Sequence, residues 1–524
     1  MTTPLRGLLI AQFCGAFNDN AWKFMVALLG IREVASLLSA GQDLETASQT
    51  QTTLAMVVFT FPLVITSLFA GVFADRVSKR TIIIAMKAVE VALMSLATMA
   101  LLFHPAGGAY SLAVLACMGV HSGIFSPAKY GVLAELLPHE QLARGNSVLE
   151  MWTFLAILTG TVGGGVLLNS AGFSPWMAPL CLTILSLVGF AASWSVPVVP
   201  PARRTGGLFD TLKGAWSALG SDRMLRLAIV GAVFFWTIAS LVVQNVLVYA
   251  KAVLGLNDAL ATVPSALISI GIGLGAFIVS RLSRSRVEYG LVPLGALGVA
   301  VVLLGVGLCA PGFWATLAFM IALGIVSAHI FIPLNALIQW RAPHQRRGSV
   351  IAFENTCVFS GILLGSLSGG LLANAGLSTT NIFTAAALVT LTGTAWALWL
   401  LPEALVRAVL VILTNSLYRL QIIGHEHVPK TGGALLVPNH VSFIDGLLLI
   451  ASLDRPVRFV VDAQYAEQPL LRPLMKVFRV IPISPYGGLR VVLRALRAAG
   501  AAVEKGELVC IFPEGQITRT GTLL

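Results

Sequence analysis

The sequence predicts an all-α membrane protein with twelve transmembrane helices in two six-helix repeats, followed by a partial α/β domain on the cytoplasmic side. Three observations predict this architecture. The 524 residues are 57% hydrophobic and only 11% charged, whereas soluble domains are about 25% charged, so most of the chain must face lipid. Apolar runs of about 20 residues recur up to residue 402. Beyond it, short apolar runs alternate with glycine and proline.

Each of the twelve apolar runs is long enough to cross a hydrocarbon core of about 30 Å. Their order along the chain sets the predicted spans, which are 8–30, 52–74, 81–103, 109–135, 149–169, 176–198, 227–250, 263–281, 288–309, 313–337, 350–373 and 380–401.

Basic residues in the loops predict the orientation. Most of them follow even-numbered spans, whereas the loops after odd-numbered spans carry Arg32, Lys251 and little else. Because Lys and Arg are enriched in cytoplasmic loops, we expect both termini and everything after Pro402 to be cytoplasmic. The net charge of +11 has the same explanation, and we expect no nucleic-acid partner.

The chain also repeats itself. The segment FSPAKYGVLAELLPHEQLARGNSVLE (125–150) is echoed by FIPLNALIQWRAPHQRRGSVIAFE (331–354). Large secondary carriers are built from two such halves, with the cargo site where the halves meet. We therefore expect a transporter domain at 1–402, with halves at 1–198 and 227–402 and a cytoplasmic linker at 199–226.

The segment GVFADRVSKR, residues 71–80, lies between spans 2 and 3. Gly71 permits close helix approach, Asp75 can cap the next helix, and basic residues such as Arg76 hold the loop inside. The segment is similar to the cytoplasmic signature loop of the major facilitator superfamily. An ordinary basic loop is the plainer interpretation, but the twelve spans and the repeat favour the superfamily.

Polar residues inside the spans are functional candidates because charge at membrane depth is costly. Span 1 carries Asn18, Asp19 and Asn20, followed by Lys23. Asp19 and Lys23 stand at i and i+4 and can pair on one face. Span 4 carries Lys129 beside a proline, which removes a backbone hydrogen bond. An acid and a base facing a shared cavity suit a zwitterionic or anionic amphiphile.

Other polar residues in the spans have simpler explanations. Lys87 and Glu90 stand three residues apart on span 3, away from these strings, and we expect them to pair with each other. The rest are expected to tie helices to basic loops or to be satisfied within the bundle: Glu135, Glu150, Glu354, His121 and His329.

The strings AQFCGAFNDN, FSPAKYGVLAEL and GNSVLEMWTFLAILTGTVGGGVL make the resemblance more specific. They resemble the bacterial lysophospholipid transporter branch of the superfamily, over about the first 400 residues. Members move lysophospholipids, chiefly lysophosphatidylethanolamine, from the outer to the inner leaflet of the inner membrane. The resemblance implies that Asp19, Asn20 and Lys129 line the headgroup path and that transport needs no ATP.

The segment 403–524 is predicted to be a membrane-attached α/β domain. The runs GGALLVPNH, RFVVDA and ELVCIFPEG are predicted strands. Residues 404–421 are predicted to lie as a helix on the cytoplasmic face. GLRVVLRALRAAGAAVEKGE predicts an amphipathic helix with Arg490, Arg494 and Arg497 on one face. That face suits an acidic carrier protein or anionic headgroups, and a merely solvated surface is the alternative.

Within this domain, His440 and Asp445 form an H-x4-D pattern in NHVSFIDG. Acyl transfer to an alcohol needs a base for the hydroxyl proton. Histidine has a suitable pKa, and a carboxylate can hold its ring in the right tautomer. The pattern alone is weak, but the string FPEG follows about seventy residues later.

Together, NHVSFIDG, VIPIS and FPEG closely resemble the glycerophospholipid acyltransferase family, of the 2-acylglycerophosphoethanolamine acyltransferase type. The resemblance implies that His440 is the base, that Asp445 orients it, that Glu514 and Gly515 shape the phosphate pocket, and that Arg479 reaches the phosphate.

Two departures from the family follow FPEG. Arg519 comes later than the arginine that members often carry, which puts its role as a phosphate ligand in doubt. The family's last apolar strand is missing, and about 120 residues stand where the family uses roughly 200. We therefore expect a fragment or an interrupted reading frame. Longer relatives continue into an acyl-carrier-protein ligase domain, which nothing in this sequence encodes.

The main hypothesis is a multi-pass inner-membrane protein that imports lysophospholipid and reacylates it, using acyl-carrier protein or acyl-CoA as the donor. The six cysteines are scattered without a CxxC pair, so we expect neither a metal site nor a disulfide framework. We also expect no cofactor. One alternative is an exporter of drugs or metabolites with an inert tail. Another is an acyltransferase that uses the twelve spans only as an anchor, although an anchor would not need charges at membrane depth.

Overall fold

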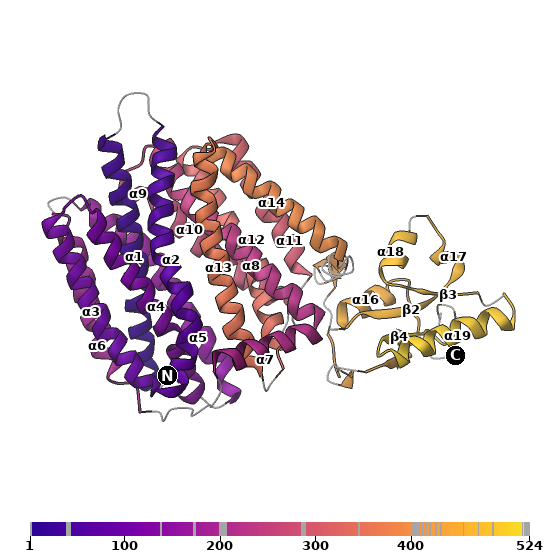
Figure 1. Ribbon diagram of the computed structural model, residues 1–524. Coiled ribbons are helices and arrows are strands. Elements are labelled where there is room, and N and C mark those ends of the chain that lie inside the picture. The colour runs from indigo at the N-terminus through magenta and orange to yellow at the C-terminus, as the bar shows by residue number, and fades with distance from the viewer. Residues whose placement is uncertain are drawn as a thin grey trace. The chain divides into compact units, whose positions relative to one another are not determined.

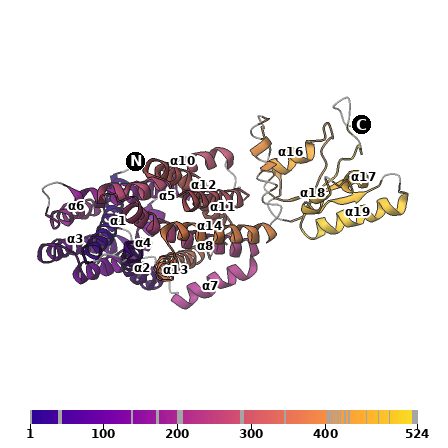
Figure 2. The same ribbon diagram turned by 90° about the horizontal axis from the view of Figure 1, so that it is seen from above.

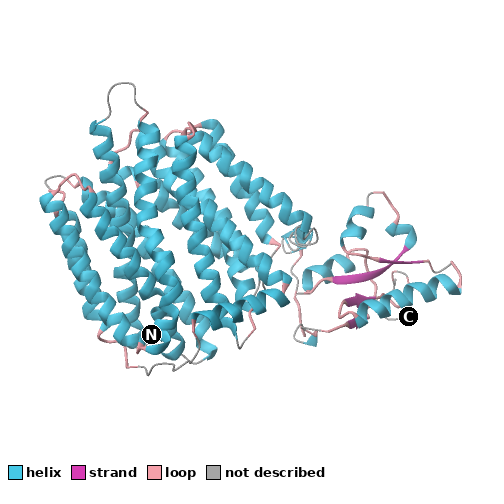
Figure 3. Cartoon of the chain, in the orientation of Figure 1, coloured by secondary structure: helices cyan, strands magenta, loops and turns pink. Residues whose placement is uncertain are grey.

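The computed structural model divides the chain into two compact units, Met1–Phe277 with Gly295–Thr392, and Ile278–Leu294 with Gly393–Leu524. Helices fill the first unit, and the strands lie in the second (Figures 1 and 3). The structure describes residues 3–37, 43–136, 139–170, 174–198, 207–283, 290–343, 346–400, and 406–517 except 407–408, 411, 415–416, 419–420, 425–426, 430–431, 454, 470, 485–486 and 516.

All twelve predicted spans are confirmed as helices. Several extend beyond the apolar run because polar residues continue the helix past the hydrocarbon. Their bounds are α1 Thr3–Leu37, α2 Leu44–Arg76, α3 Lys79–Phe103, α4 Ala109–Leu136, α5 His139–Asn169, α6 Met177–Ser193, α8 Arg223–Val248, α10 Val263–Ser283, α11 Leu291–Cys309, α12 Phe313–Arg341, α13 Arg347–Asn374 and α14 Thr379–Leu400.

Within the described residues, ten helical stretches are long and apolar enough to cross a membrane. Of the other two predicted spans, α6 has only 17 residues. Helix α1 is continuous over 35 residues, but the polar residues of FNDN interrupt its apolar run. Seen from above, α1, α3, α4 and α6 gather on one side and α8, α11 and α12 on the other (Figure 2). This is the arrangement expected of two six-helix halves.

Between the halves, the predicted linker contains a helix, α7, Leu208–Ser221. Arg346 at the start of α13 donates to Ser217 Oγ over 2.6 Å, and Arg341 Nε lies 2.8 Å from Asp222 Oδ2. Trp216 on α7 and Trp340 near the end of α12 are largely exposed. Exposed tryptophans at helix ends are typical of a membrane–water interface.

Two short helical elements follow α8 at the opposite end of the bundle. The chain turns through a π-helix, Tyr249–Val253, and then α9, Asp258–Ala261. Asn257 caps α9 by accepting a hydrogen bond from the Leu260 N–H over 2.9 Å.

Closely packed glycines make the repeat visible in three dimensions. On α5, Gly160 and Gly164 lie against the backbone of α1 at Phe17 and Ala21. On α13, Gly361 and Gly365 lie in the same way against α8 at Val233 and Thr237. Small residues four apart let two membrane helices approach closely. The fifth helix of each half therefore packs on the first by the same device.

The second unit contains a four-stranded parallel sheet in the order β1-β4-β2-β3. Its strands are β1 Ala434–Leu436, β2 Val457–Asp462, β3 Ile481–Ile483 and β4 Leu508–Cys510. The three predicted strands are confirmed as β1, β2 and β4. Among the described residues β1 and β3 form the edges, so β4, the last strand, is paired on both sides.

Helices cover both faces of this sheet. Helix α16, Asp445–Ser452, packs on the face that carries Phe459, Leu508 and Cys510. The predicted amphipathic helix is α19, Leu489–Glu504, and it packs on the opposite face against Val460 and Val509. Successive residues of one strand serve opposite faces, as the period of two requires. Two short helices, α17 Ala463–Ala466 and α18 Arg472–Val477, also belong to this unit.

The helix predicted at 404–421 was expected to carry Arg407 and Arg419 at its polar edges. Both arginines lie outside the described residues.

Candidate functional site

The His440–Asp445 pair lies at the carboxyl end of β1, in the loop that leads into α16. His440 Nδ1 is 3.0 Å from Asp445 Oδ2. The same carboxylate oxygen accepts hydrogen bonds from the backbone N–H groups of Val441, over 2.7 Å, and Ser442, over 2.8 Å. Asp445 is the first residue of α16, so its carboxylate folds back over the loop that precedes the helix.

These contacts determine the chemistry of the imidazole. Burial acts to raise the pKa of Asp445, but the hydrogen bonds from Ser442, His440 and Val441 outweigh it, and the pKa lies below its ordinary value. A carboxylate can only accept, so Nδ1 carries the proton in this bond. Nε2 is then left with a lone pair, as a general base requires.

The FPEG string meets His440 from the end of β4. Glu514 Oε2 accepts the backbone N–H of His440 over 2.9 Å. The Phe512 ring stacks on the imidazole, with 4.2 Å between ring centroids. Gly515 has a φ of +65°, which favours glycine in the turn that ends the string. Four of the residues singled out in two distant motifs therefore lie together.

Arg479, predicted to reach the phosphate, precedes β3 and is exposed. Its φ is +49°, a conformation that non-glycine residues seldom adopt. Its backbone carbonyl accepts from Arg458 Nε over 2.7 Å. Its part in phosphate binding stays a prediction, and Arg519 lies outside the described residues.

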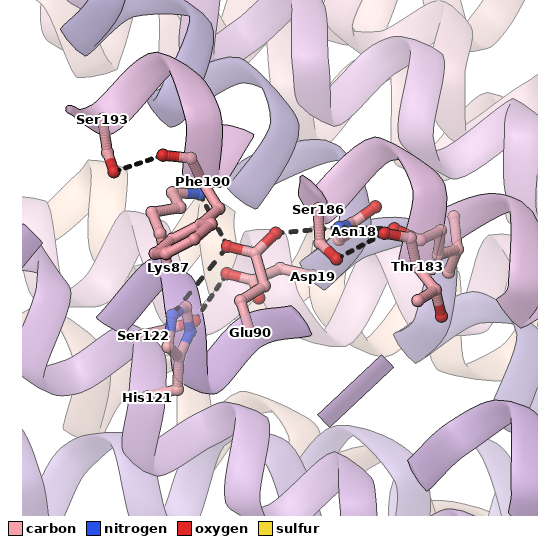
Figure 4. Close-up of polar contacts among 11 residues, drawn as sticks. Asn18, Asp19, Lys87, Glu90, His121, Ser122, Thr183, Ser186, Phe190 and Ser193 are labelled. Carbon is pink, nitrogen blue, oxygen red and sulfur yellow. Dashed lines mark hydrogen bonds and ion pairs between the residues drawn. The ribbon is translucent and has the colours of Figure 1, made fainter. Parts of the chain in front are cut away.

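A second candidate site lies among α1, α3 and α4 (Figure 4). Asn18 Nδ2 donates to Glu90 Oε1 over 2.8 Å and to the Leu182 carbonyl over 3.2 Å. Asp19 Oδ2 accepts from Ser122 Oγ over 2.6 Å. Asp19 Oδ1 is buried and has no hydrogen-bond partner among the described residues. The two neighbours in the FNDN string thus point to different helices.

The Lys87–Glu90 pair belongs to this cluster. The predicted bond between them is confirmed, at 2.6 Å between Lys87 Nζ and Glu90 Oε2. Both side chains are fully buried, and His121 Nε2 lies 3.9 Å from the same oxygen. The expectation that the pair stands apart from the polar string was wrong, because the bond from Asn18 joins them. Ser122 was missed entirely, since one serine in a span carries no signal of its own.

Lys23 does not make the expected bond with Asp19. Lys23 Nζ donates instead to Asn20 Oδ1 over 3.1 Å, and it lies over the Phe59 ring, 5.3 Å from the centroid. Asn20 Nδ2 donates to the Ala16 carbonyl within the helix over 2.8 Å. The i, i+4 spacing permits a pair, but Ser122 on the neighbouring helix α4 takes the carboxylate.

Lys129 lies farther along α4 and is half-buried. It is within electrostatic range of Glu150 and Asp19, and of the positive charge on Lys87. Helix α4 continues through Pro127, as α12 does through Pro333. These prolines stand at matching places in the repeated segments.

The predicted signature segment is mostly helical. Helix α2 continues to Arg76, and α3 begins at Lys79. Ser78 occupies the N-cap position of α3 and makes no side-chain capping bond, and the capping role of Asp75 stays a prediction. The side chains of Gly71, Asp75 and Arg76 lie outside the described residues.

Contacts between the halves include a group of ion pairs at the end of the bundle far from the N-terminus. Asp258 Oδ1 is 2.7 Å from Lys251 Nζ, and Asp258 also pairs with Arg32 of α1. Only 2% of the Asp258 side chain is exposed. Glu45 Oε2, at the start of α2, accepts from the Thr379 N–H over 2.8 Å. The sequence identified Arg32 and Lys251 only as loop cations. Their shared partner, Asp258, lies in the second half of the chain, far along the sequence from Arg32, so no local pattern links the two.

Two family models match the chain. The model described as Major Facilitator Superfamily matches residues 8–366, and the model described as Acyltransferase matches residues 419–524.

Curated relatives match the helical part. A protein of Photorhabdus laumondii is 29% identical over 350 residues, which cover 65% of this chain and 80% of the relative. A protein of Yersinia enterocolitica is 30% identical over 363 residues, covering 66% and 82%. A protein of an Enterobacter species is 28% identical over 390 residues, covering 71% and 89%. All three are named lysophospholipid transporter LplT.

Solved structures share the fold of the helical part. A POT family transporter in complex with a thioalcohol-conjugated peptide superposes with a TM-score of 0.59 at 13% identity, over 76% of this chain and 96% of its own. The POT family transporter PepTSo gives 0.55 at 14% identity, over 80% and 99%. At such identities the likeness is one of fold alone.

Proposed function

The chain belongs to the Major Facilitator Superfamily, and on that premise we propose that it carries lysophospholipids inward across a bacterial inner membrane and reacylates them on the cytoplasmic side. One observation carries the proposal. The same chain holds a buried acid–base cluster in its spanning helices and a carboxylate-oriented histidine at the end of a strand. The names of the relatives in three bacteria support the cargo.

The headgroup of lysophosphatidylethanolamine is a zwitterion, which suits the first site. Asp19 Oδ1 is a buried acceptor without a hydrogen-bond partner among the described residues, so it can receive the ammonium group. Lys129 and Lys23 supply positive charge for the phosphate. Asn18 ties α1 to α3 and α6, and Asn20 Oδ1 accepts from Lys23 Nζ. Charges at membrane depth are costly and are retained where a substrate path needs them.

In the proposed transport cycle, the ion pairs of Asp258 hold the outer side of the carrier closed in one of its states. With the N-terminus on the cytoplasmic side, as the loop charges predict, Arg32, Lys251 and Asp258 lie at the periplasmic end. They join α1 of one half to the segment after α8 of the other. This arrangement supports a carrier whose site is open toward the cytoplasm, as alternating access requires in one of its two states.

The second site suits acyl transfer to the lysolipid hydroxyl. His440 Nε2 takes the hydroxyl proton, and the lipid oxygen bonds to the thioester carbonyl carbon. The carbon–sulfur bond then breaks, and the thiol of acyl-carrier protein or CoA leaves with the proton returned by His440. Asp445 steadies the imidazolium between these two transfers. Gly515 and Arg479 remain the proposed groups near the lipid phosphate, and residues 403–524 are the proposed acyltransferase domain.

Joining the two activities has a thermodynamic rationale. A lysolipid moved between leaflets can return by the same path. The two-chain product is not a substrate of a carrier for one-chain lipids and therefore cannot return. Acylation at the exit therefore makes net inward movement effectively irreversible. The combined activity is repair of membrane phospholipid.

The test is uptake of radiolabelled lysophosphatidylethanolamine into spheroplasts that lack their own carrier. We expect saturable uptake by this chain and loss of uptake by Asp19→Asn, with Glu33→Gln, an exposed change on the same helix, as the matched control. Extracted lipids are separated to show whether the label has become two-chain. Uptake no higher than in empty cells, or competition by small hydrophobic cations, would favour an exporter. Acylation without uptake would favour a membrane-anchored enzyme.

A further inference from the structure

The carboxylate of Glu514 lies against the backbone of the proposed base rather than in open solvent. Its Oε2 accepts the His440 N–H over 2.9 Å. Its Oε1 is buried and has no hydrogen-bond partner among the described residues. The contact joins residues 74 positions apart, and the sequence resemblance assigned Glu514 to the phosphate pocket instead.

Two carboxylates share the backbone of the catalytic loop. The N–H of His440 is bound by Glu514, and the next two N–H groups, of Val441 and Ser442, are bound by Asp445. Three consecutive donors are therefore satisfied from two sides. Such bonds to ionised acceptors are among the stronger ones in proteins, so they hold the loop in a single conformation.

The imidazole itself is held from the same string. Phe512, two residues before Glu514, stacks on its face with an interplanar angle of 26°, while Asp445 holds its edge through Nδ1. Glu514 thus restrains the backbone of His440, Phe512 restrains the face of its ring, and Asp445 restrains the edge. Nε2 keeps a fixed direction toward the reacting hydroxyl, which matters because a displacement of about 1 Å can cost about 100-fold in rate.

Direct phosphate binding is a poor use for this side chain. An ionised carboxylate offers only acceptors, and the lipid phosphate is itself an anion that accepts hydrogen bonds. Two such groups repel each other. The Gly515 N–H that follows is also engaged, because it donates to the Phe512 carbonyl over 3.2 Å.

We infer that Glu514 is a positioning residue for His440 and does not itself contact the lipid phosphate. This inference rests on the proposed acyl transfer at the same site. It removes Glu514 from the phosphate pocket and leaves Gly515 and Arg479 as the proposed groups near the phosphate.

The kinetic test uses the full chain in nanodiscs, with lysophosphatidylethanolamine and acyl-carrier protein as donor. We expect Glu514→Ala to lower kcat by about 10- to 100-fold with KM for the lysolipid within about twofold. Glu514→Gln keeps a carbonyl acceptor for the His440 N–H, so we expect at least a third of the wild-type kcat. Glu467→Ala, exposed in the same unit, is the control. A raised KM with unchanged kcat, or Glu514→Gln as inactive as Glu514→Ala, overturns the inference.

A second measurement does not depend on acyl transfer. The rate at which diethylpyrocarbonate modifies His440 is followed by peptide mass spectrometry in the same proteins. We expect a change of at least about threefold in Glu514→Ala and none in Glu514→Gln or Glu467→Ala, because only the first loses the acceptor. Equal rates in all four proteins overturn the inference. If the wild type transfers no acyl group, the proposed function fails, and this measurement still decides the role of Glu514.

Discussion

Asp445 illustrates how much one side chain can organise. A single carboxylate oxygen meets two backbone N–H groups and His440 Nδ1. The H-x4-D spacing is what allows this, because it returns the first residue of α16 to the loop before it. These bonds keep the pKa of Asp445 below its ordinary value, so the carboxylate stays ionised through neutral and mildly acidic pH.

For acyl transfer, we predict that Asp445→Asn lowers kcat by about 100- to 10,000-fold. The asparagine amide can donate to Nδ1, which favours the tautomer whose Nε2 carries the proton and cannot act as a base. Because the pKa of Asp445 is lowered, its contribution is present above its ordinary value of about 3.9 and is lost only as pH falls through a still lower value. The carboxylate is therefore ionised throughout pH 5 to 8 in the wild type, and the variant should be slower at every pH in this range, as measured by thioester consumption. A loss confined to the acid side would contradict this.

The buried Lys87–Glu90 pair leads to a stability prediction. Removing one partner leaves the other charged and buried, at a cost of about 3–5 kcal/mol. We expect Glu90→Gln to lower the Tm of the detergent-solubilised protein sharply, and Lys87→Met with Glu90→Gln to recover most of the loss. The exposed Glu33→Gln is the control. If the double variant were no more stable than Glu90→Gln, the lost stability would come from the hydrogen bond between Asn18 and the Glu90 carboxylate and not from the unpaired charge of Lys87.

At the scale of elements, small residues decide how the helices approach. The same i, i+4 glycine pairs join α5 to α1 and α13 to α8. A β-carbon at any of them would meet backbone atoms of the facing helix, which cannot move aside without shifting the whole element. The repeat in the sequence is therefore also a repeat of contacts.

Helix α10 offers a matched pair of glycines to test this. A β-carbon at Gly271 would meet the Ile321 carbonyl of α12, whereas one at Gly273 would meet nothing. We predict that Gly271→Ala destabilises the protein by about 1–3 kcal/mol, and that Gly273→Ala stabilises it by up to about 1 kcal/mol through helix propensity. Thermal unfolding in detergent measures both. Equal shifts of the same sign would contradict the close packing of α10 and α12.

For the whole helical unit, the contacts of Asp258 join the two halves at one end. Gln49 on α2 is almost fully buried there, beside Gly369 of α13. We predict that Gln49→Cys reacts slowly with a membrane-impermeant maleimide added outside, and that adding Asp258→Asn speeds the reaction at least about fivefold, because a differential free energy of about 1 kcal/mol shifts a two-state population by that factor.

Labelling is measured by mass spectrometry of the peptide that contains position 49, so that the native cysteines do not interfere. Asp43→Asn, an exposed change at the N-cap of α2, serves as the control for the chemistry of this end. An unchanged rate with Asp258→Asn would argue against a closure that depends on this ion-pair group.

For the whole chain, we predict that its two activities separate by mutation. His440→Ala should import labelled lysophosphatidylethanolamine and leave it lyso, whereas Asp19→Asn should not import it but should acylate lysolipid supplied on the cytoplasmic side of inverted vesicles. The reason is that the two sites use different residues in different units. Thin-layer separation of extracted lipid measures both. Loss of both activities in either variant would contradict independent sites.

The sequence by itself determined the twelve helices, the repeat that relates them, three of the four strands and the two motifs around His440, because hydrophobic length, period and short motifs are local properties. Tertiary structure alone decided the bond of Asn18 to Glu90, the bond of Glu514 to His440 and the bonds of Asp258 to Arg32 and Lys251. Three of these four contacts join residues more than seventy positions apart. Such partners depend on the register and rotation of packed elements, which no local pattern encodes.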